Sequence, residues 1–157
     1  MADSKNKWKI KLVNYYPPYF FSGIKVIDIN DDITQLTTQL KLAWYNKNLF
    51  DSHFGGSLYS MCDPFFVFIA VANLGDAYIV WDKSAKIKFK KPGYGKVTAL
   101  FEISKEQLKK MKEEVDKEGK KTFFFTTQVT DSSNEVIAEI EKEVYIRRKD
   151  FVKPPNH

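Results

Sequence analysis

The sequence has few of the residues that build disulfide frameworks or metal centres. Cys62 is the only cysteine among 157 residues, which excludes an intramolecular disulfide and fits a reducing compartment. The two histidines, His53 and His157, are too few for a metal site, so we expect none. Cys62 is interpreted as a packing residue, because no second cysteine and no histidine of fixed role accompanies it.

The sequence also lacks a long hydrophobic run. The most apolar run covers residues 65–72, whereas a membrane-spanning helix needs about 20 apolar residues. Residues 1–11 are polar and charged, so no secretory signal is visible. We therefore expect a soluble, cytoplasmic protein without a membrane span.

Basic residues exceed acidic ones without forming a nucleic-acid-binding motif. The chain has 25 lysines and arginines against 20 acidic residues, a formal charge of +5. No zinc knuckle, RNA-binding strand motif or basic helix is present, so nucleic acid is not an expected partner. The lysines are scattered, which favours a solvated surface. The alternative is a local patch for phosphate groups, such as those of a coenzyme A derivative.

The chain length fits one domain over residues 1–157. Residues 1–16 are predicted to form a helical segment that ends at Pro17 and Pro18, because proline lacks the backbone donor. Residues 149–157 are predicted to form a polar tail. A surface helix is expected at 105–117, where Ser104 and Gln107 form a capping-box pattern.

Alternating apolar and polar side chains predict an antiparallel sheet of about six strands. On the last strand, for example, Ala138, Ile140 and Val144 are predicted to face one way, and Glu139 and Glu141 the other. The expected strands cover residues 24–29, 34–44, 78–90, 97–103, 123–130 and 136–147.

Residues 55–75 have the length of a helix but almost no polar face from Leu58 onward. A helix that is apolar all round is expected to be buried on all sides. In a domain this small only a curved sheet can cover it, so the sequence predicts an α+β fold in which the sheet wraps around a central helix. Pro64 is expected to kink this helix at Asp63.

Four stretches carry a resemblance to a known superfamily: NKNLFDSHFGGSLYSMCDPF (46–65), YPPYFFSGIKV (16–26), YIVWDKSAKIKFKKPGYGKV (78–97) and VYIRRK (144–149). They resemble the hotdog-fold thioesterases and, more closely, the thioesterase-like family called DUF4442. The similarity runs from about Tyr16 to Arg148. It implies a hotdog fold and edge-to-edge homodimers or larger oligomers with sites at the subunit interface.

The resemblance also implies a catalytic site. Related thioesterases begin the central helix with His-Gly-Gly, whose glycine amides polarise the thioester carbonyl, and carry an acidic residue seven positions later. Gly55 and Gly56 followed by Asp63 keep that spacing, and Asn48 is the best match for an upstream positioning asparagine. Phe54 occupies the histidine position, so the histidine role is not transferred to His53. The alternative is that Asp63 is a structural carboxylate bonded to the backbone or to a partner subunit.

Two functions therefore remain open, besides a purely structural or assembly role that predicts neither binding nor turnover. The first is hydrolysis of an acyl thioester, such as an acyl-CoA, by metal-free water attack, with no cofactor beyond the coenzyme A of the substrate. Lys86, Lys88, Lys90 and Arg147 would bind its phosphates, unless they only keep an exposed sheet face soluble. The second is a non-catalytic module that binds acyl chains, in which aromatic residues such as Phe65, Phe66 and Phe89 line a tunnel.

Overall fold

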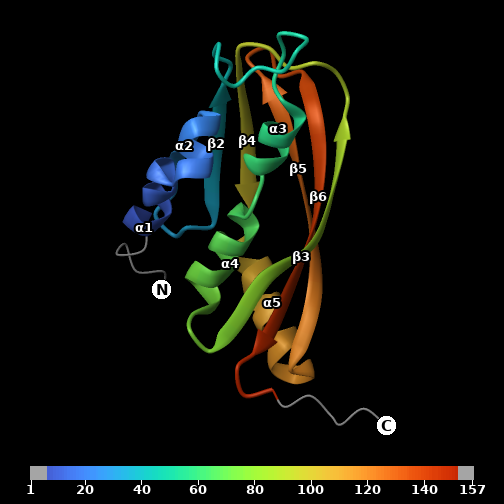
Figure 1. Ribbon diagram of the computed structural model, residues 1–157. Helices are drawn as coiled ribbons and strands as arrows, with labels where there is room; N and C mark the ends of the chain where they lie inside the picture. The colour runs from blue at the N-terminus through green and yellow to red at the C-terminus, as the bar shows by residue number, and fades with distance from the viewer. Residues whose placement is uncertain (1–6, 152–157) are drawn as a thin grey trace.

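The computed structural model describes residues 7–151, which contain a six-stranded antiparallel sheet. Its strands lie in the order β1-β2-β4-β5-β6-β3, so that β1 and β3 form the edges (Figure 1). The strands are β1 (Ile24–Ile29), β2 (Gln35–Lys41), β3 (Tyr78–Phe89), β4 (Lys96–Glu102), β5 (Lys120–Asp131) and β6 (Val136–Arg148). Six strands were predicted within a few residues of these bounds, and the predicted α+β class is confirmed.

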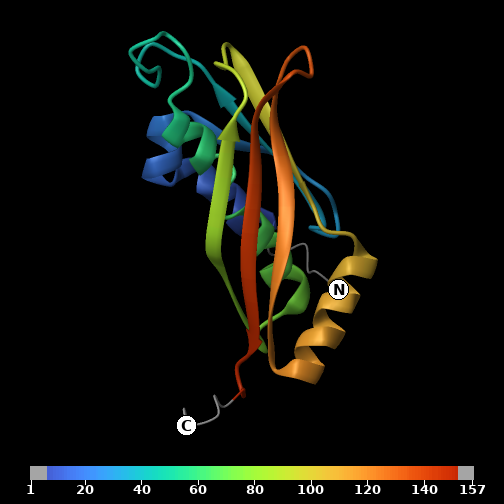
Figure 2. The same cartoon turned by 90° about the vertical axis from the view of Figure 1, so that its right-hand side faces the viewer.

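The inward side of the sheet is apolar because the predicted alternation is present. Leu36 and Leu40 of β2 and Val97 and Phe101 of β4 are fully buried. Strand β6 pairs with β5 on one side and with β3 on the other, and the three lie side by side in Figure 2. β6 is therefore the central strand of these three, and its inward residues lie between those of β5 and β3.

The central helix differs from the prediction in two ways. It is divided into α3 (Gly55–Ser60) and α4 (Phe65–Leu74), separated by a turn that contains Asp63 and Pro64. Because Pro64 has no N–H, the helical ladder cannot continue through it. The two short helices follow one another along the sheet in Figure 1.

The expectation that this segment is buried on all sides is wrong. The face of α4 that carries Phe65, Phe66 and Ile69 is buried against the sheet, but Val71 on another face is 48% exposed. The six strands cover one side of α4 only. Residues 55–74 are long and apolar enough to cross a membrane by composition, and half of that segment is buried. It is the core helix of this sheet.

The N-terminal segment contains one helix that the sequence did not predict. Helix α1 (Lys7–Lys11) and a 3-10 turn (Leu12–Tyr15) lie where a helical segment was expected. Pro17 and Pro18, expected only to end a helix, begin α2 (Pro17–Ser22). Proline is suited to the first helical turn, because its missing N–H has no partner to lose there. The first six residues of the predicted helical segment and residues 152–157 of the predicted tail lie outside the described residues.

Helix α5 (Lys105–Glu118) begins as predicted. The Ser104 hydroxyl accepts from the Gln107 amide, and the Gln107 side chain accepts from the Ser104 amide. Its apolar stripe of Leu108, Met111 and Val115 is buried. Figure 2 shows α5 at the lower end of the sheet, where it leads into the first residues of β5.

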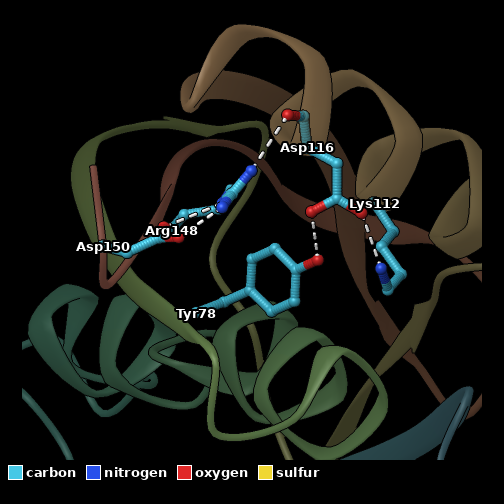
Figure 3. A network of polar contacts seen from close by, with 5 residues as sticks. All are labelled: Tyr78, Lys112, Asp116, Arg148 and Asp150. Atoms are coloured by element: carbon cyan, nitrogen blue, oxygen red, sulfur yellow. Dashed lines mark hydrogen bonds and ion pairs between the residues drawn. The ribbon is translucent and has the colours of Figure 1, made fainter.

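A polar network ties α5 to the neighbouring strands (Figure 3). The Tyr78 hydroxyl donates to Asp116 Oδ1 at 2.5 Å, and Lys112 Nζ donates to Oδ2 at 2.6 Å. Arg148 Nη1 reaches the Asp116 carbonyl at 3.4 Å and pairs with Asp150. Tyr78 is buried and the charged groups are exposed or half-buried, so the network fastens α5 to β3 and to the end of β6.

Candidate active site

Asp63 lies in the turn between α3 and α4 and contacts two charged residues from the sheet. The ammonium of Lys142 donates to Asp63 Oδ1 and lies 3.0 Å from Asp82 Oδ2. Two carboxylates thus share one ammonium. We call Asp63, Asp82 and Lys142 the carboxylate–lysine cluster.

Lys142 is the buried member of the cluster, with a side chain that is 1% exposed. On β6 it follows Ile140 and precedes Val144 on the inward side, in the phase that the alternation assigns to the core. A lysine is rarely buried unless it is paired. The sequence interpretation missed Lys142, although the same alternation, continued through position 142, places it inside.

Asp82 faces inward because β3 contains an irregularity. Between Asp82 and Ser84 the register with β6 shifts by one residue. Even-numbered residues such as Val80 and Asp82 face inward before it, and odd-numbered ones such as Ala85 and Ile87 after it. A β-bulge of this kind re-aims side chains. No sequence pattern marked it, which is why Asp82 was missed.

The cluster separates the proton affinities of its two carboxylates. Burial and the neighbouring Asp63 carboxyl raise the pKa of Asp82 from 3.8 to about 6. Burial also raises the pKa of Asp63, but the adjacent Asp82 and Lys142 outweigh it and hold that pKa below 3.8. Burial lowers the pKa of Lys142, but its two carboxylate partners outweigh that effect and raise it. At neutral pH Asp63 is therefore ionised and Lys142 protonated.

The backbone around Asp63 is fixed by hydroxyl groups. Tyr19 of α2 donates to the Asp63 carbonyl, and Thr38 of β2 donates to the Met61 carbonyl at 2.9 Å. The Asp63 side chain is 39% exposed, so it is partly open to solvent. Cys62 is fully buried, and burial raises the pKa of its thiol, as expected for a packing residue.

Gly55 and Gly56 lie at the start of α3 beside a cleft of about 430 Å³. Gly55 lines the cleft together with Asn48, His53, Leu58 and other residues of the preceding loop and the 89–93 turn. Neither glycine amide donates a hydrogen bond to a residue within 7–151. Both amides are therefore unpaired donors within the described residues, as is usual in the first turn of a helix.

Asn48 was predicted to position a reacting group, but its side chain is hydrogen-bonded to residues of its own loop. Its side-chain oxygen accepts from the Phe50 and Ser52 amides, and its nitrogen donates to Ser52 Oγ and to the His53 carbonyl. Asn48 therefore shapes the wall of the cleft. His53 is buried, and its Nε2 lies 3.2 Å from the Gly95 carbonyl. Burial lowers the pKa of His53 despite that carbonyl, so the ring is neutral at pH 7.

Asp63 does not line the cleft beside Gly55. Seven residues of helix correspond to about 10 Å along the axis, and the intervening α3 keeps Gly56 and Asp63 apart by a distance of that order. The predicted glycine and aspartate groups are thus both present in one chain, but in two neighbouring places.

The predicted phosphate-binding residues lie on the outer side of β3 and β6. Lys86, Lys88 and Lys90 are exposed in one row, as predicted, but Lys88 pairs with Glu141 at 3.7 Å and Lys90 with Glu139 at 2.8 Å. Lys90 also lines the cleft beside Gly55. Arg147 is opposite Ile79, about 20 Å along β6 from the residue that pairs with Lys86, so it does not join the row.

Metal ligands do not gather anywhere in the part of the chain that the structure describes. Residues 7–151 contain no group of three or more histidine, cysteine, aspartate or glutamate side chains placed to hold an ion. The described chemistry is that of the carboxylate–lysine cluster and the glycine amides.

The family described as "Domain of unknown function (DUF4442)" matches residues 6–146. The chain belongs to the DUF4442 family. No curated protein sequence matches it significantly. The membership confirms the resemblance carried by the Gly-Gly stretch and its flanking segments.

Solved structures share the fold at low sequence identity. A Pseudomonas aeruginosa protein whose name includes "Probable Thioesterase" has a TM-score of 0.79 and 18% identity, over 91% of this chain and 95% of that one. A Haemophilus influenzae thioesterase has a TM-score of 0.66 and 9% sequence identity, over 92% of each chain. The Escherichia coli PaaI protein from the phenylacetic acid degradation operon has a TM-score of 0.62 and 16% sequence identity, over 92% of this chain and 94% of that one. The hotdog fold of the thioesterases is confirmed for this DUF4442 protein.

Proposed function

We propose that this DUF4442 protein hydrolyses an acyl thioester, with Asp63 as the general base. The observation that carries the proposal is a partly exposed carboxylate held ionised by a buried ammonium at the position where related thioesterases have their acidic residue. A carboxylate of this kind can take a proton from water at neutral pH.

In the proposed reaction, Asp63 accepts one proton of a water molecule while the water oxygen bonds to the thioester carbon. The carbonyl electrons move to oxygen, where the free Gly55 and Gly56 amides stabilise the negative charge. The C–S bond then breaks as the carbonyl re-forms. The thiolate takes the proton from Asp63, which leaves a carboxylic acid, a thiol and the original carboxylate.

The separation of Gly56 from Asp63 within one chain supports a site shared between two subunits. We propose a homodimer in which the Asp63 of one subunit faces the cleft beside Gly55 of its partner. Strand β3 is an edge strand with unpaired backbone groups on its outer side, which a second β3 can satisfy. We expect light scattering to give at least twice the 18.3 kDa chain mass; a monomer at working concentration contradicts the shared site.

The proposed substrate is an acyl-CoA in the cytoplasm. Lys90 at the cleft, with Lys86 and Lys88 behind it on β3, provides positive charge for the phosphates of coenzyme A. Arg147 lies too far from this row to share the same phosphate group. The cleft of about 430 Å³ has the size of a small-molecule site, and Leu58 and Phe89 give it an apolar wall for an acyl group.

The test is thiol release from short, medium and aromatic acyl-CoAs by the wild type and by Asp63→Asn. We expect turnover in the wild type and a loss of at least about 10²-fold in the variant, since a general base contributes that much or more. Asp51→Asn is a matched control, because Asp51 is an exposed loop aspartate paired with Lys47 and should be silent. Equal turnover in Asp63→Asn and wild type would reject the mechanism.

The second candidate function is non-catalytic binding of an acyl chain. Phe65 and Phe66, expected to line a tunnel, are core residues packed against Phe101. A separate groove of about 880 Å³ beside α2 is lined by exposed aromatics that include Phe21 and Trp44. Saturable acyl-CoA binding without thiol release, in folded wild-type protein, would select this function.

A further inference from the structure

The carboxylate–lysine cluster contains two residues that the proposed reaction does not yet use. Lys142 is fully buried, and a buried ammonium is costly to a fold even when it is paired. Its neighbours on the inward side of β6, Ile140 and Val144, show that an apolar residue would fit the same alternation. Asp82 is 19% exposed, and neither of its oxygens has hydrogen-bond geometry with a described group.

We propose that Lys142 and Asp82 are positioning residues for hydrolysis: Lys142 aims the Asp63 carboxylate and keeps it ionised, and Asp82 adjusts its basicity through the shared ammonium. The inference rests on the proposed function of Asp63. Lys142 donates to Asp63 Oδ1 and, at 3.0 Å, faces Asp82 Oδ2, so both carboxylates respond to one positive charge.

The three groups come from three separate elements, so the cluster is not the product of one local sequence. Asp63 is in the turn after α3, Asp82 precedes the irregularity of β3, and Lys142 is in the middle of β6. Without the register shift Asp82 would lie on the wrong side of the sheet to reach Lys142. The bulge therefore has a definite effect, which is to deliver a second carboxylate to the ammonium.

Other groups that face the cluster are not charged at neutral pH. The Tyr19 hydroxyl of α2 donates to the Asp63 carbonyl, and burial raises its pKa. Cys62 is buried with a raised pKa. The Tyr59 ring of α3 lies 5.6 Å from Lys142 Nζ, a cation–π contact that favours the ammonium form. The charge at the cluster is therefore set by Asp63, Asp82 and Lys142.

When Asp82 is protonated, Asp63 is the only negatively charged carboxylate beside the Lys142 ammonium. Ionisation of Asp82 adds a second negative charge. The added negative charge makes Asp63 hold a proton more strongly, which makes it a better acceptor for the proton of water. Below the pKa of Asp82, about 6, Asp63 remains ionised but is a weaker base. The rate of hydrolysis should therefore rise with pH through this region and level off above it.

The first test is the pH profile of kcat for wild type, Asp82→Asn, Lys142→Arg and Lys142→Met. The wild type should show an inflection near pH 6. In Asp82→Asn the inflection should be lost, and kcat at pH 8 should fall on the order of tenfold with KM unchanged. Lys142→Met should lose on the order of 10²-fold, and Lys142→Arg should recover part of that loss because it restores the positive charge.

The control is Lys121→Met, which removes a surface lysine that also lies between two carboxylates, Glu114 at 3.5 Å and Glu118 at 3.0 Å. It should leave both kcat and the inflection unchanged. An inflection that persists in Asp82→Asn, while Asp63→Asn is inactive, would overturn the role of Asp82 and leave the proposed function standing.

A second measurement does not depend on turnover. Carbon-13 NMR titration of labelled aspartates should show Asp63 protonating at higher pH in Lys142→Met, and Asp82 protonating at lower pH in Asp63→Asn, than in wild type. If the wild type hydrolyses no thioester, the proposed function fails, and these titrations still decide whether the cluster governs Asp63. An Asp63 titration unmoved in Lys142→Met, together with an Asp82 titration unmoved in Asp63→Asn, would overturn the inference.

Discussion

Two lysines of this protein lie between two carboxylates each, and their surroundings differ completely. Lys142 is 1% exposed and joins Asp63 and Asp82 inside the sheet, whereas Lys121 is 35% exposed and joins Glu114 and Glu118 beside α5. Solvent screens the second group, so a surface ion pair adds little to stability. In the carboxylate–lysine cluster Lys142 is fully buried and Asp82 is 19% exposed, so solvent screens their charges far less. The same three-charge pattern is therefore a surface feature beside α5 and a candidate chemical centre on the inward side of β6 and β3.

Removing the ammonium tests this contrast most strongly. Lys142→Met leaves two carboxylates facing each other without a counter-charge, and breaking a buried pair in this way costs about 3–5 kcal/mol. Because Asp63 is 39% exposed, we expect the lower end, about 3 kcal/mol, in urea unfolding. Lys121→Met should unfold at the same urea concentration as wild type. Equal loss in the two variants would show that burial does not distinguish them.

A smaller effect is expected in the pH dependence of stability. The pKa of Asp82 is raised from 3.8 to about 6, so between these values the folded state binds more protons than the unfolded chain. The free energy of unfolding should therefore fall as pH rises from about 4 to 6. Asp63 has the opposite sign: its pKa is lowered, so its contribution is present above pH 3.8 and is lost below it.

Asp82→Asn should remove the slope between pH 4 and 6 and leave the acid transition below pH 4, where Asp63 is protonated. Urea unfolding at half-unit pH intervals measures both. A slope that survives in Asp82→Asn would mean that another carboxyl group is responsible. The two variants together separate the loss of the ammonium from the loss of the adjusting carboxylate.

The sheet could be predicted from the sequence because alternation is a local signal. Strand β1 was predicted at its observed bounds of 24–29, and the capping box at Ser104 gave the start of α5. The extent to which α4 is buried could not be predicted, because it depends on how far the sheet curves. Helix α2 was missed because proline was interpreted only as a helix breaker, although it is also a favoured first residue.

The candidate site was predictable in part for the same reason. Gly55, Gly56 and Asp63 lie within one segment, where the resemblance to the thioesterases could assign them by their spacing, and the fold places Asp63 in a turn that is partly open to solvent. Asp82 depends on a register shift, and Lys142 is 79 residues from Asp63 in sequence. The pairing of β3 with β6 brings Asp82 to Lys142, and the packing of the α3–α4 turn on the sheet brings Asp63 to both; neither contact follows from a local sequence pattern.

The place of β6 in the sheet has a consequence for the nascent chain. Asp63 and Asp82 leave the ribosome long before Lys142, and β6 is the strand that joins β5 to β3. Until it has been synthesised, β3 has no neighbour within its own chain and both carboxylates lack their counter-ion. Chains interrupted before residue 136 would therefore present an open strand to chaperones and proteases. Synthesis of β6 therefore supplies both the neighbour that β3 lacks and the counter-ion, Lys142, that the two carboxylates lack.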